Sequence, residues 1–179
     1  MIVVDVETTG LWAHAHAIVS IGAIDFENPL TTFYSECCIW EGAAIDEQAL
    51  RVNGFTREQI CDPNAPSQNE VMNNLLDWAA GVADKTLAGH HVAFDISMLR
   101  AALKREQLLW PFGHQSIDLY NACYLHMLQN RHPLPLKRGA VSMSANRVYE
   151  YVGLPREPEP HHGLMGAKME AEAFSRLIH

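Results

Sequence analysis

Two carboxylates, Asp5 and Glu7, stand within an otherwise apolar run near the start of the chain. The surrounding residues 2–6 are β-branched apart from Asp5, which predicts a strand buried on both faces. Side chains alternate along a strand, so both carboxylates point to the same side. Adjacent buried anions repel each other strongly unless a cation neutralises them. Because no thiol or histidine shares the motif, the pattern predicts a hard divalent metal, Mg²⁺ or Mn²⁺. A solvated edge strand with alternating acids is the alternative, and the apolar neighbours argue against it.

Two later segments carry further candidates. Asp95 falls at the start of an expected helix, where the end of the preceding strand would place it beside Asp5. Alone, Asp95 would be interpreted as a carboxylate stabilised by the helix dipole; with the first pair present, it is predicted to be a third metal ligand. His161 and His162 lie at the entrance of the last expected helix, where a histidine could act as general base on a water molecule. A single histidine in such a place is more often a capping or surface residue.

The elements that must position these residues follow from hydrophobic periodicity and turn signals. Asn28–Pro29 marks a short turn, so the first three strands are expected to form an antiparallel meander. Strands followed by alternating helices and strands predict an α/β domain with a mixed five-stranded sheet, three antiparallel strands then parallel ones, flanked by helices. Strands are expected within residues 1–10 and at 18–26, 33–40, 86–90 and 116–119, and helices at 46–50, 56–60, 67–80, 94–107, 120–128, 144–151 and 164–178.

Length and composition favour one globular domain over residues 1–179, because 48% of the residues are hydrophobic. There is no run of 18 apolar residues, and the chain begins directly in its first strand, so a cytoplasmic protein without a membrane contact is expected. The formal charge of −8 argues against electrostatic binding of long duplex nucleic acid, but allows a short end held through metal ions. Residues 129–140 form a basic loop that either contacts a polyanion or is a plain surface loop.

Asp5-Val6-Glu7-Thr8-Thr9-Gly10, Gly89-His90-His91-Val92-Ala93-Phe94-Asp95 and the histidine before the last helix occur in this order. Together they resemble the motifs of the DEDDh, or DnaQ-like, 3′–5′ exonuclease family, which includes ribonuclease T and the proofreading subunit of DNA polymerase III. His91 stands where the family usually has Asn. The resemblance covers nearly the whole chain and implies a ribonuclease H-like fold.

The last motif departs from the family pattern. Counting back from the final helix makes His161 the match to the catalytic histidine, with His162 as a near competitor. Gly166 stands where the family has a metal-binding Asp, and no Asp follows Asp118. Glu170 lies one turn further along the same helical face and is long enough to be a substitute ligand. A solvated helix residue is the equal alternative for Glu170. A glycine within a helix also costs roughly 1 kcal/mol relative to alanine, which calls for a reason.

The resemblance implies two-metal hydrolysis of phosphodiester bonds at the 3′ end of single-stranded DNA or RNA, releasing nucleoside 5′-monophosphates. It assigns Asp5 as the bridging ligand, Glu7 to the metal that activates water, Asp95 to the second metal and His161 as general base. Thr8, Thr9, His91 and Phe94 are the expected substrate contacts, with Phe94 either stacked on a base or wedged into the core. A homodimer or a polymerase partner is left open.

A rival interpretation rests on Gly166. A nuclease fold that has lost one of four carboxylates would bind metal weakly and could be retained to bind nucleic-acid ends or a protein partner. The survival of Asp5, Glu7, Asp95 and His161 favours an active enzyme, because a purely structural descendant has no need of buried acids.

Overall fold

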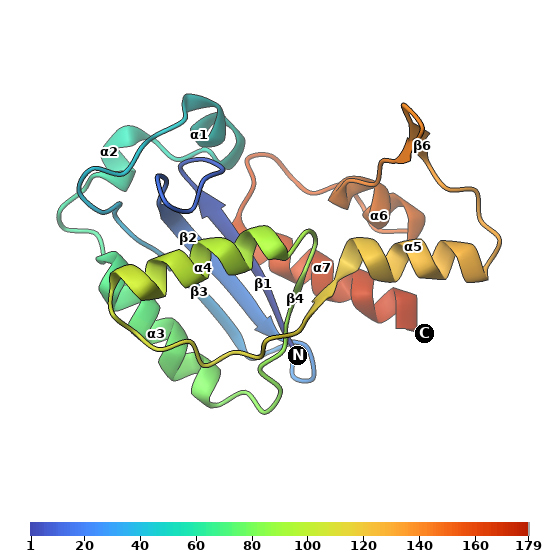
Figure 1. The fold of residues 1–179 in the computed structure, drawn as a ribbon, viewed down its shortest axis with the longest axis horizontal. Coiled ribbons are helices and arrows are strands. Elements are labelled where there is room, and N and C mark those ends of the chain that lie inside the picture. The colour runs from blue at the N-terminus through green and yellow to red at the C-terminus, as the bar shows by residue number, and fades with distance from the viewer. Residues whose placement is uncertain (179) are drawn as a thin grey trace.

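The computed structural model describes residues 1–178, and its centre is a mixed five-stranded sheet in the order β3-β2-β1-β4-β5 (Figure 1). The first three strands are antiparallel, and β4 and β5 run parallel to β1. This confirms the predicted fold class. The strands are β1 (Ile2–Thr8), β2 (Ile18–Asp25), β3 (Thr32–Glu36), β4 (Leu87–Gly89) and β5 (Ser116–Asp118).

The third strand ends at Glu36, so the prediction of a strand over residues 33–40 was wrong at its C-terminal end. The backbone N–H groups of Cys38 and Ile39 donate to the carbonyls of Pro66 and Ile60 instead of continuing the ladder with β2. These loop partners satisfy the backbone equally well, so an apolar run does not have to remain a strand.

Seven helices of the described chain agree with the predicted set to within a few residues. Thr56 and Ser67 each form the capping box that begins a helix. Gly54 ends the first helix in the left-handed conformation. The helices are α1 (Glu47–Asn53), α2 (Arg57–Ile60), α3 (Gln68–Ala80), α4 (Ala93–Arg105), α5 (Leu119–Gln129), α6 (Ala145–Tyr151) and α7 (Gly163–Ile178).

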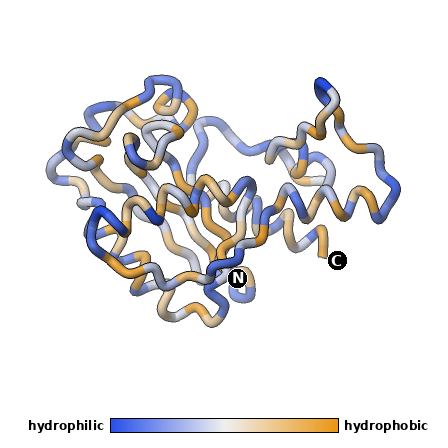
Figure 2. Tube along the Cα trace, in the orientation of Figure 1, coloured by the Kyte–Doolittle hydropathy of each residue, from blue (hydrophilic) through white to orange (hydrophobic). Residues whose placement is uncertain are grey.

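The sheet lies between two layers of helices, with α3 and α4 on one face and α5 and α7 on the other (Figure 1). Figure 2 shows the hydrophobic strands running between them. Along β1, Val4 and Val6 join the core beneath α3 and α4, whereas Val3 joins the core of α5 and α7. Asp5 and Glu7 share the parity of Val3, so the alternation directs both carboxylates to the α7 side.

The segment at 129–140 is not wholly irregular, which corrects the prediction of a loop throughout. The strands β6 (Leu136–Lys137) and β7 (Ala140–Val141) form a short antiparallel hairpin. Arg138 and Gly139 both have positive φ, as a two-residue hairpin turn of type I′ requires. The strands are too short to show alternating hydrophobicity, so periodicity did not reveal them.

The start of α7 packs directly onto β2 through two glycines. A Cβ atom on Gly22 would overlap the backbone of Gly163 and Leu164, and one on Gly163 would meet the carbonyl oxygen of Asp5 at 3.0 Å. This close approach places the first turns of α7 beside the two carboxylates of β1. Within residues 1–178, no helix combines the length and the hydropathy needed to cross a membrane.

We expect Gly22→Ala to lower the free energy of unfolding by about 3 kcal/mol, because the added methyl group meets backbone atoms that cannot rotate away. Urea unfolding followed by circular dichroism measures the change. Gly81→Ala is the matched control: Gly81 has a right-handed conformation, and its nearest neighbour would lie 3.5 Å from the new Cβ. An equal loss in both variants would show that the contact of β2 with α7 is not the cause.

Candidate active site

Gly166 lies against the carboxylate of Asp5. A Cβ atom built on Gly166 would overlap Oδ2 of Asp5, so any side chain at this position would displace that carboxylate. The unexplained glycine of the last motif thus has a physical reason: it leaves room for the Asp5 side chain beside α7.

Asp95 lies against the strand that carries Asp5 and Glu7. Its side chain is buried in the first turn of α4, and Oδ1 accepts a hydrogen bond of 3.0 Å from the backbone N–H of Val6. The short strand β4 pairs with β1 only at Ile2 and Val3, so the Val6 N–H lies beyond that ladder and takes the carboxylate as its partner. Asp95 is therefore next to Asp5 in space, although its role as a metal ligand stays a prediction.

Glu170 is inside the protein, which excludes the solvated alternative. The residue is 6% exposed, and its Oε2 has no hydrogen-bond partner among the described residues. Glu172, two residues later, is exposed and pairs with Arg176 at 2.8 Å, as expected from the helical rotation.

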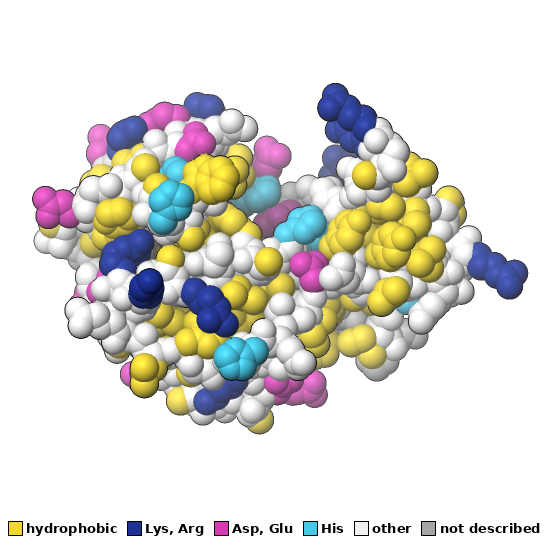
Figure 3. Space-filling model, viewed as in Figure 1, with side chains coloured by type: hydrophobic (Ala, Val, Ile, Leu, Met, Phe, Trp, Pro, Cys, Tyr) yellow, Lys and Arg dark blue, Asp and Glu magenta, His cyan; other side chains and the backbone are white. Residues whose placement is uncertain are grey.

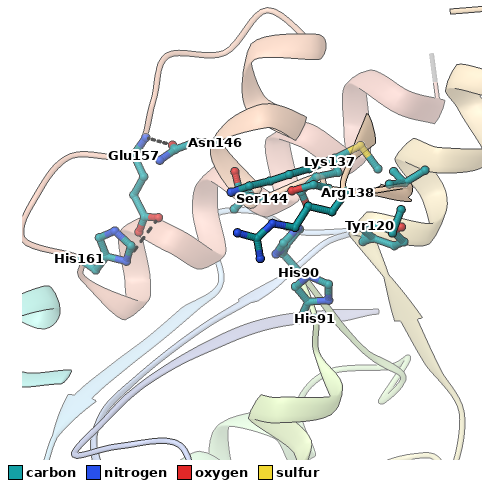
Figure 4. Close-up of a pocket in the computed structure, with 14 residues that line it drawn as sticks. His90, His91, Tyr120, Lys137, Arg138, Ser144, Asn146, Glu157 and His161 are labelled. Carbon is teal, nitrogen blue, oxygen red and sulfur yellow. Dashed lines mark hydrogen bonds and ion pairs between the residues drawn. The ribbon is translucent and has the colours of Figure 1, made fainter. Parts of the chain in front are cut away.

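Glu157 is a further acidic residue of the site, and sequence reasoning missed it. Its side chain is 8% exposed, and its Oε1 is buried with no hydrogen-bond partner in the described chain. Oε2 lies 3.8 Å from Nδ1 of His161, and the backbone N–H donates to Oδ1 of Asn146 at 2.8 Å (Figure 4). The surrounding Glu-Pro-Glu-Pro segment is typical of an exposed linker, so no local signal marked this residue.

Burial raises the pKa values of all these carboxyl groups, and repulsion between carboxylates adds to the effect for all except Glu157. Removal from water is the largest cause of the strongly raised pKa of Asp5, followed by the charges of Glu170 and Asp95. Burial raises the pKa of Glu7 to about 7, partly offset by His161, and burial raises that of Asp95 to about 8. Burial likewise raises the pKa of Glu157, and raises that of Glu170 well above its ordinary value. Near neutral pH the cluster therefore favours either bound protons or a cation.

The donor set fits a divalent metal. As they stand, no three His, Cys, Asp or Glu side chains of residues 1–178 are arranged to ligate an ion. The unpartnered oxygens of Glu157 and Glu170 are nevertheless buried in a cluster of carboxylates, where a cation would compensate their lost hydration. An all-oxygen, anionic set suits Mg²⁺ or Mn²⁺.

The two adjacent histidines have different surroundings. His161 faces Glu157, and its charge influences Glu7. The ring of His162 stacks on Tyr34 at a centroid distance of 4.3 Å. This arrangement supports His161 over His162 as the general base.

An open cavity of about 810 Å³ extends from His161 to the β6–β7 hairpin (Figure 4). Figure 3 shows the corresponding hollow, with His and acidic side chains within it and Lys or Arg side chains at the hairpin tip beside it. A smaller cavity of about 290 Å³ has Glu7 in its wall. The larger cavity is lined by His90, His91, Tyr120, Lys137, Arg138, Asn146, Glu157 and His161, among others, and the smaller by Val6, Glu7, Thr8, Leu11, Val52 and Phe94, among others.

The expected substrate residues divide between these cavities, with one exception. Thr8 and the half-buried Phe94 line the smaller cavity, and His91, stacked on Tyr120, lines the larger one. Thr9 is fully buried: its hydroxyl donates to the carbonyl of Ala44 at 2.7 Å and accepts from the N–H of Ala17 at 2.9 Å. The Thr9 side chain therefore supports the fold and has no free hydroxyl for a substrate.

A family model described as an exonuclease, that of RNase T, matches residues 2–174. Ribonuclease T of Vibrio campbellii is 30% identical over 125 residues, which cover 60% of this chain and 56% of that protein. The DNA polymerase III subunit epsilon of Treponema pallidum is 28% identical over 118 residues, or 65% of this chain and 51% of that protein. The chain thus spans about half the length of these two curated relatives.

Solved structures show the same fold. The nuclease domain of 3′hExo, a DEDDh family member bound to rAMP, superposes with a TM-score of 0.74 and 17% identity, covering 99% of this chain and 90% of that one. Exonuclease I of E. coli, in complex with a dT13 oligonucleotide, superposes with a TM-score of 0.77 and 16% identity, covering 99% of this chain and 40% of that one.

Proposed function

Since the chain belongs to the RNase T exonuclease family, we propose that it hydrolyses phosphodiester bonds at the 3′ end of single-stranded nucleic acid and releases nucleoside 5′-monophosphates. One observation carries the proposal: carboxylates from β1, α4 and α7 lie in one buried cluster, in which the charge of His161 acts on Glu7, and His161 lines an open cavity. That combination supplies a cation site and a base next to space for a polymer.

Asp5, Glu7, Asp95 and Glu170 would hold Mg²⁺ or Mn²⁺. When bound, two such ions supply Lewis-acid stabilisation of the charge that develops on the phosphate. The hydrogen bond from the Val6 N–H holds Asp95 in place, and the lack of a side chain at Gly166 leaves room for the Asp5 carboxylate. The protein thus fixes the carboxylates before substrate arrives, which reduces the cost of organising the site.

His161 would take the proton from the attacking water at Nε2. Its Nδ1 faces the Glu157 carboxylate at 3.8 Å, which orients the ring and stabilises the imidazolium formed after proton transfer. The ring lines the larger cavity, so a water molecule beside a bound phosphate is within its reach.

We assign the 3′-terminal nucleotide to the smaller cavity, where Phe94 offers an aromatic face and Thr8 borders Glu7. The preceding nucleotides would pass through the larger cavity, past His91 and Tyr120 towards the hairpin. Stacking and backbone contacts of this kind accept any base, so no sequence preference is expected. The rAMP and dT13 bound by two structural neighbours support testing both RNA and DNA.

The test uses single-stranded DNA and RNA labelled at the 5′ or the 3′ end, with Mg²⁺, Mn²⁺ or EDTA. With metal, we expect the 5′-labelled strand to shorten stepwise and the 3′-labelled strand to release a labelled mononucleotide at once. With EDTA, we expect neither. Cleavage in the middle of the strand, or shortening from the 5′ end, would contradict the proposal.

Gly166 supports one other candidate, a disabled nuclease fold that binds 3′ ends or a protein partner, because the helix lacks the usual carboxylate there. The same assay separates the two. Binding of the labelled strands by the protein, without cleavage under any metal condition, would favour the disabled fold. The similarity to a polymerase III subunit supports examining a polymerase as partner in that case.

Lys137 and Arg138 extend from the hairpin at the larger cavity (Figure 4). We expect Lys137→Ala/Arg138→Ala to raise KM for a single-stranded oligonucleotide by about tenfold with little change in kcat, and to weaken the salt dependence of binding, because phosphate contacts are lost. Lys104→Ala, at the exposed far end of α4 from Asp95, is the control. Identical salt dependence in the double variant and the wild type would show that the hairpin does not contact the strand.

A further inference from the structure

Among the carboxylates of the proposed function, none comes from position 166, where Gly166 stands in place of an expected ligand. We propose that Glu157, from the segment before α7, supplies the carboxylate that position 166 lacks and binds the same cation as Asp5. This inference rests on the proposed function, and it assigns to that metal site a ligand that lies outside α7.

The first reason is the shared space. Oε1 of Glu157 lies 3.3 Å from the ideal Cβ position of Gly166, and Oδ2 of Asp5 overlaps that position itself. The two carboxylate oxygens therefore converge on the place where an aspartate at 166 would project. A side chain at 166 and the Glu157 carboxylate would compete for this space, so glycine at 166 and glutamate at 157 are compatible as a pair.

The second reason is the unpaired state of the Glu157 carboxylate. The Glu157 side chain is only 8% exposed, and its Oε1 is buried with no hydrogen-bond partner within residues 1–178. A buried carboxylate oxygen without a donor loses its hydration with no compensation. A cation between Glu157 and Asp5 would provide that compensation, whereas the described part of the chain offers Oε1 no donor.

The third reason is that the backbone holds Glu157 in this position. Its N–H donates to the side chain of Asn146 on α6, and Pro158 restricts it to extended conformations. Oε2 faces His161 while Oε1 faces Gly166, so one carboxylate can bind a cation and orient the base at the same time.

Glu170 occupies a different side of the cluster. Oε2 of Glu170 lies 3.1 Å from the ideal Cβ position of Gly89 at the end of β4, and the charge of Asp95 is the largest electrostatic influence on its pKa. Glu170 therefore lies on the β4 side of the cluster, where its charge also acts on Asp5, and Glu157 is the carboxylate beside position 166.

Mn²⁺ binding without substrate tests this assignment, measured by the EPR signal of free Mn²⁺ and by calorimetry. We expect Glu157→Gln to weaken binding by at least about tenfold. Glu159→Gln is the matched control, since Glu159 is exposed two residues away in the same Pro-rich segment, and it should bind as the wild type does. Glu157→Asp keeps the negative charge on a shorter side chain, and should bind Mn²⁺ more tightly than Glu157→Gln does.

Three results would overturn the inference. Wild-type Mn²⁺ affinity in Glu157→Gln would show that Glu157 is not a ligand, and a changed pH–rate profile in that variant would then assign it to positioning His161. Equal Mn²⁺ affinity of Glu157→Asp and Glu157→Gln, with circular dichroism unchanged, would show that the charge at position 157 does not bind the cation. Absence of Mn²⁺ binding in the wild type would refute the metal site itself, which is a failure of the proposed function and is distinguished by the wild-type measurement.

Discussion

Asp5→Asn is expected to lower the rate of single-strand hydrolysis by at least about 10³-fold while the protein remains folded. The two side chains have the same shape, so packing beside Gly166 is retained, but one negative charge is lost from the centre of the carboxylate cluster. Without metal, the variant should be more stable than the wild type, because the burial of a charge and the repulsion from neighbouring carboxylates, which together raise the pKa of Asp5, no longer apply.

Single-turnover hydrolysis of a 5′-labelled oligonucleotide measures the activity, and thermal unfolding in EDTA measures the stability. Asp77→Asn, on the exposed face of α3, is the control and should change neither quantity. Activity of Asp5→Asn within tenfold of the wild type would show that the cluster does not carry the chemistry.

The metal-free protein is expected to lose stability as the pH rises from about 5 to above 8. The folded-state pKa values of Glu7 and Asp95 are raised from 4.5 to about 7 and from 3.8 to about 8. A group with a raised pKa binds its proton more tightly in the folded state, so its stabilising effect is complete below the unfolded pKa and is lost as the pH passes the folded pKa. For Glu7 alone the loss is roughly 3 kcal/mol.

Scanning calorimetry in EDTA should show a fall in Tm on the order of 10 °C across this interval. Saturating Mn²⁺ should reverse the fall at pH 8, because the cation replaces the protons. Asp95→Asn should flatten the metal-free profile, while Asp77→Asn should leave it unchanged. A Tm in EDTA that is constant between pH 5 and 8 would contradict the raised pKa values.

The fold and the first half of the site follow from local patterns. A β-branched run with two acids spaced by two residues requires a buried strand with both carboxylates on one side, and β1 has this arrangement. The capping residues Thr56 and Ser67 act on their own helices, so their effects are readable from neighbours along the chain. The rule that a helix begins near the end of the strand before it predicts Asp95 beside β1, and the hydrogen bond that Asp95 accepts from the Val6 N–H agrees.

Other features depend on contacts between residues distant in sequence. Glu157 looks like a linker residue, and only its packing against Gly166 reveals a buried, unpartnered carboxylate. The same contact of α7 with β1 explains why position 166 is glycine, which appeared as a defect in the motif. Thr9 lies within a conspicuous motif, yet its hydroxyl is occupied by Ala17 and Ala44. Periodicity and caps report the environment that a residue has along its own element, whereas the burial of one particular carboxylate depends on which other segments pack against it.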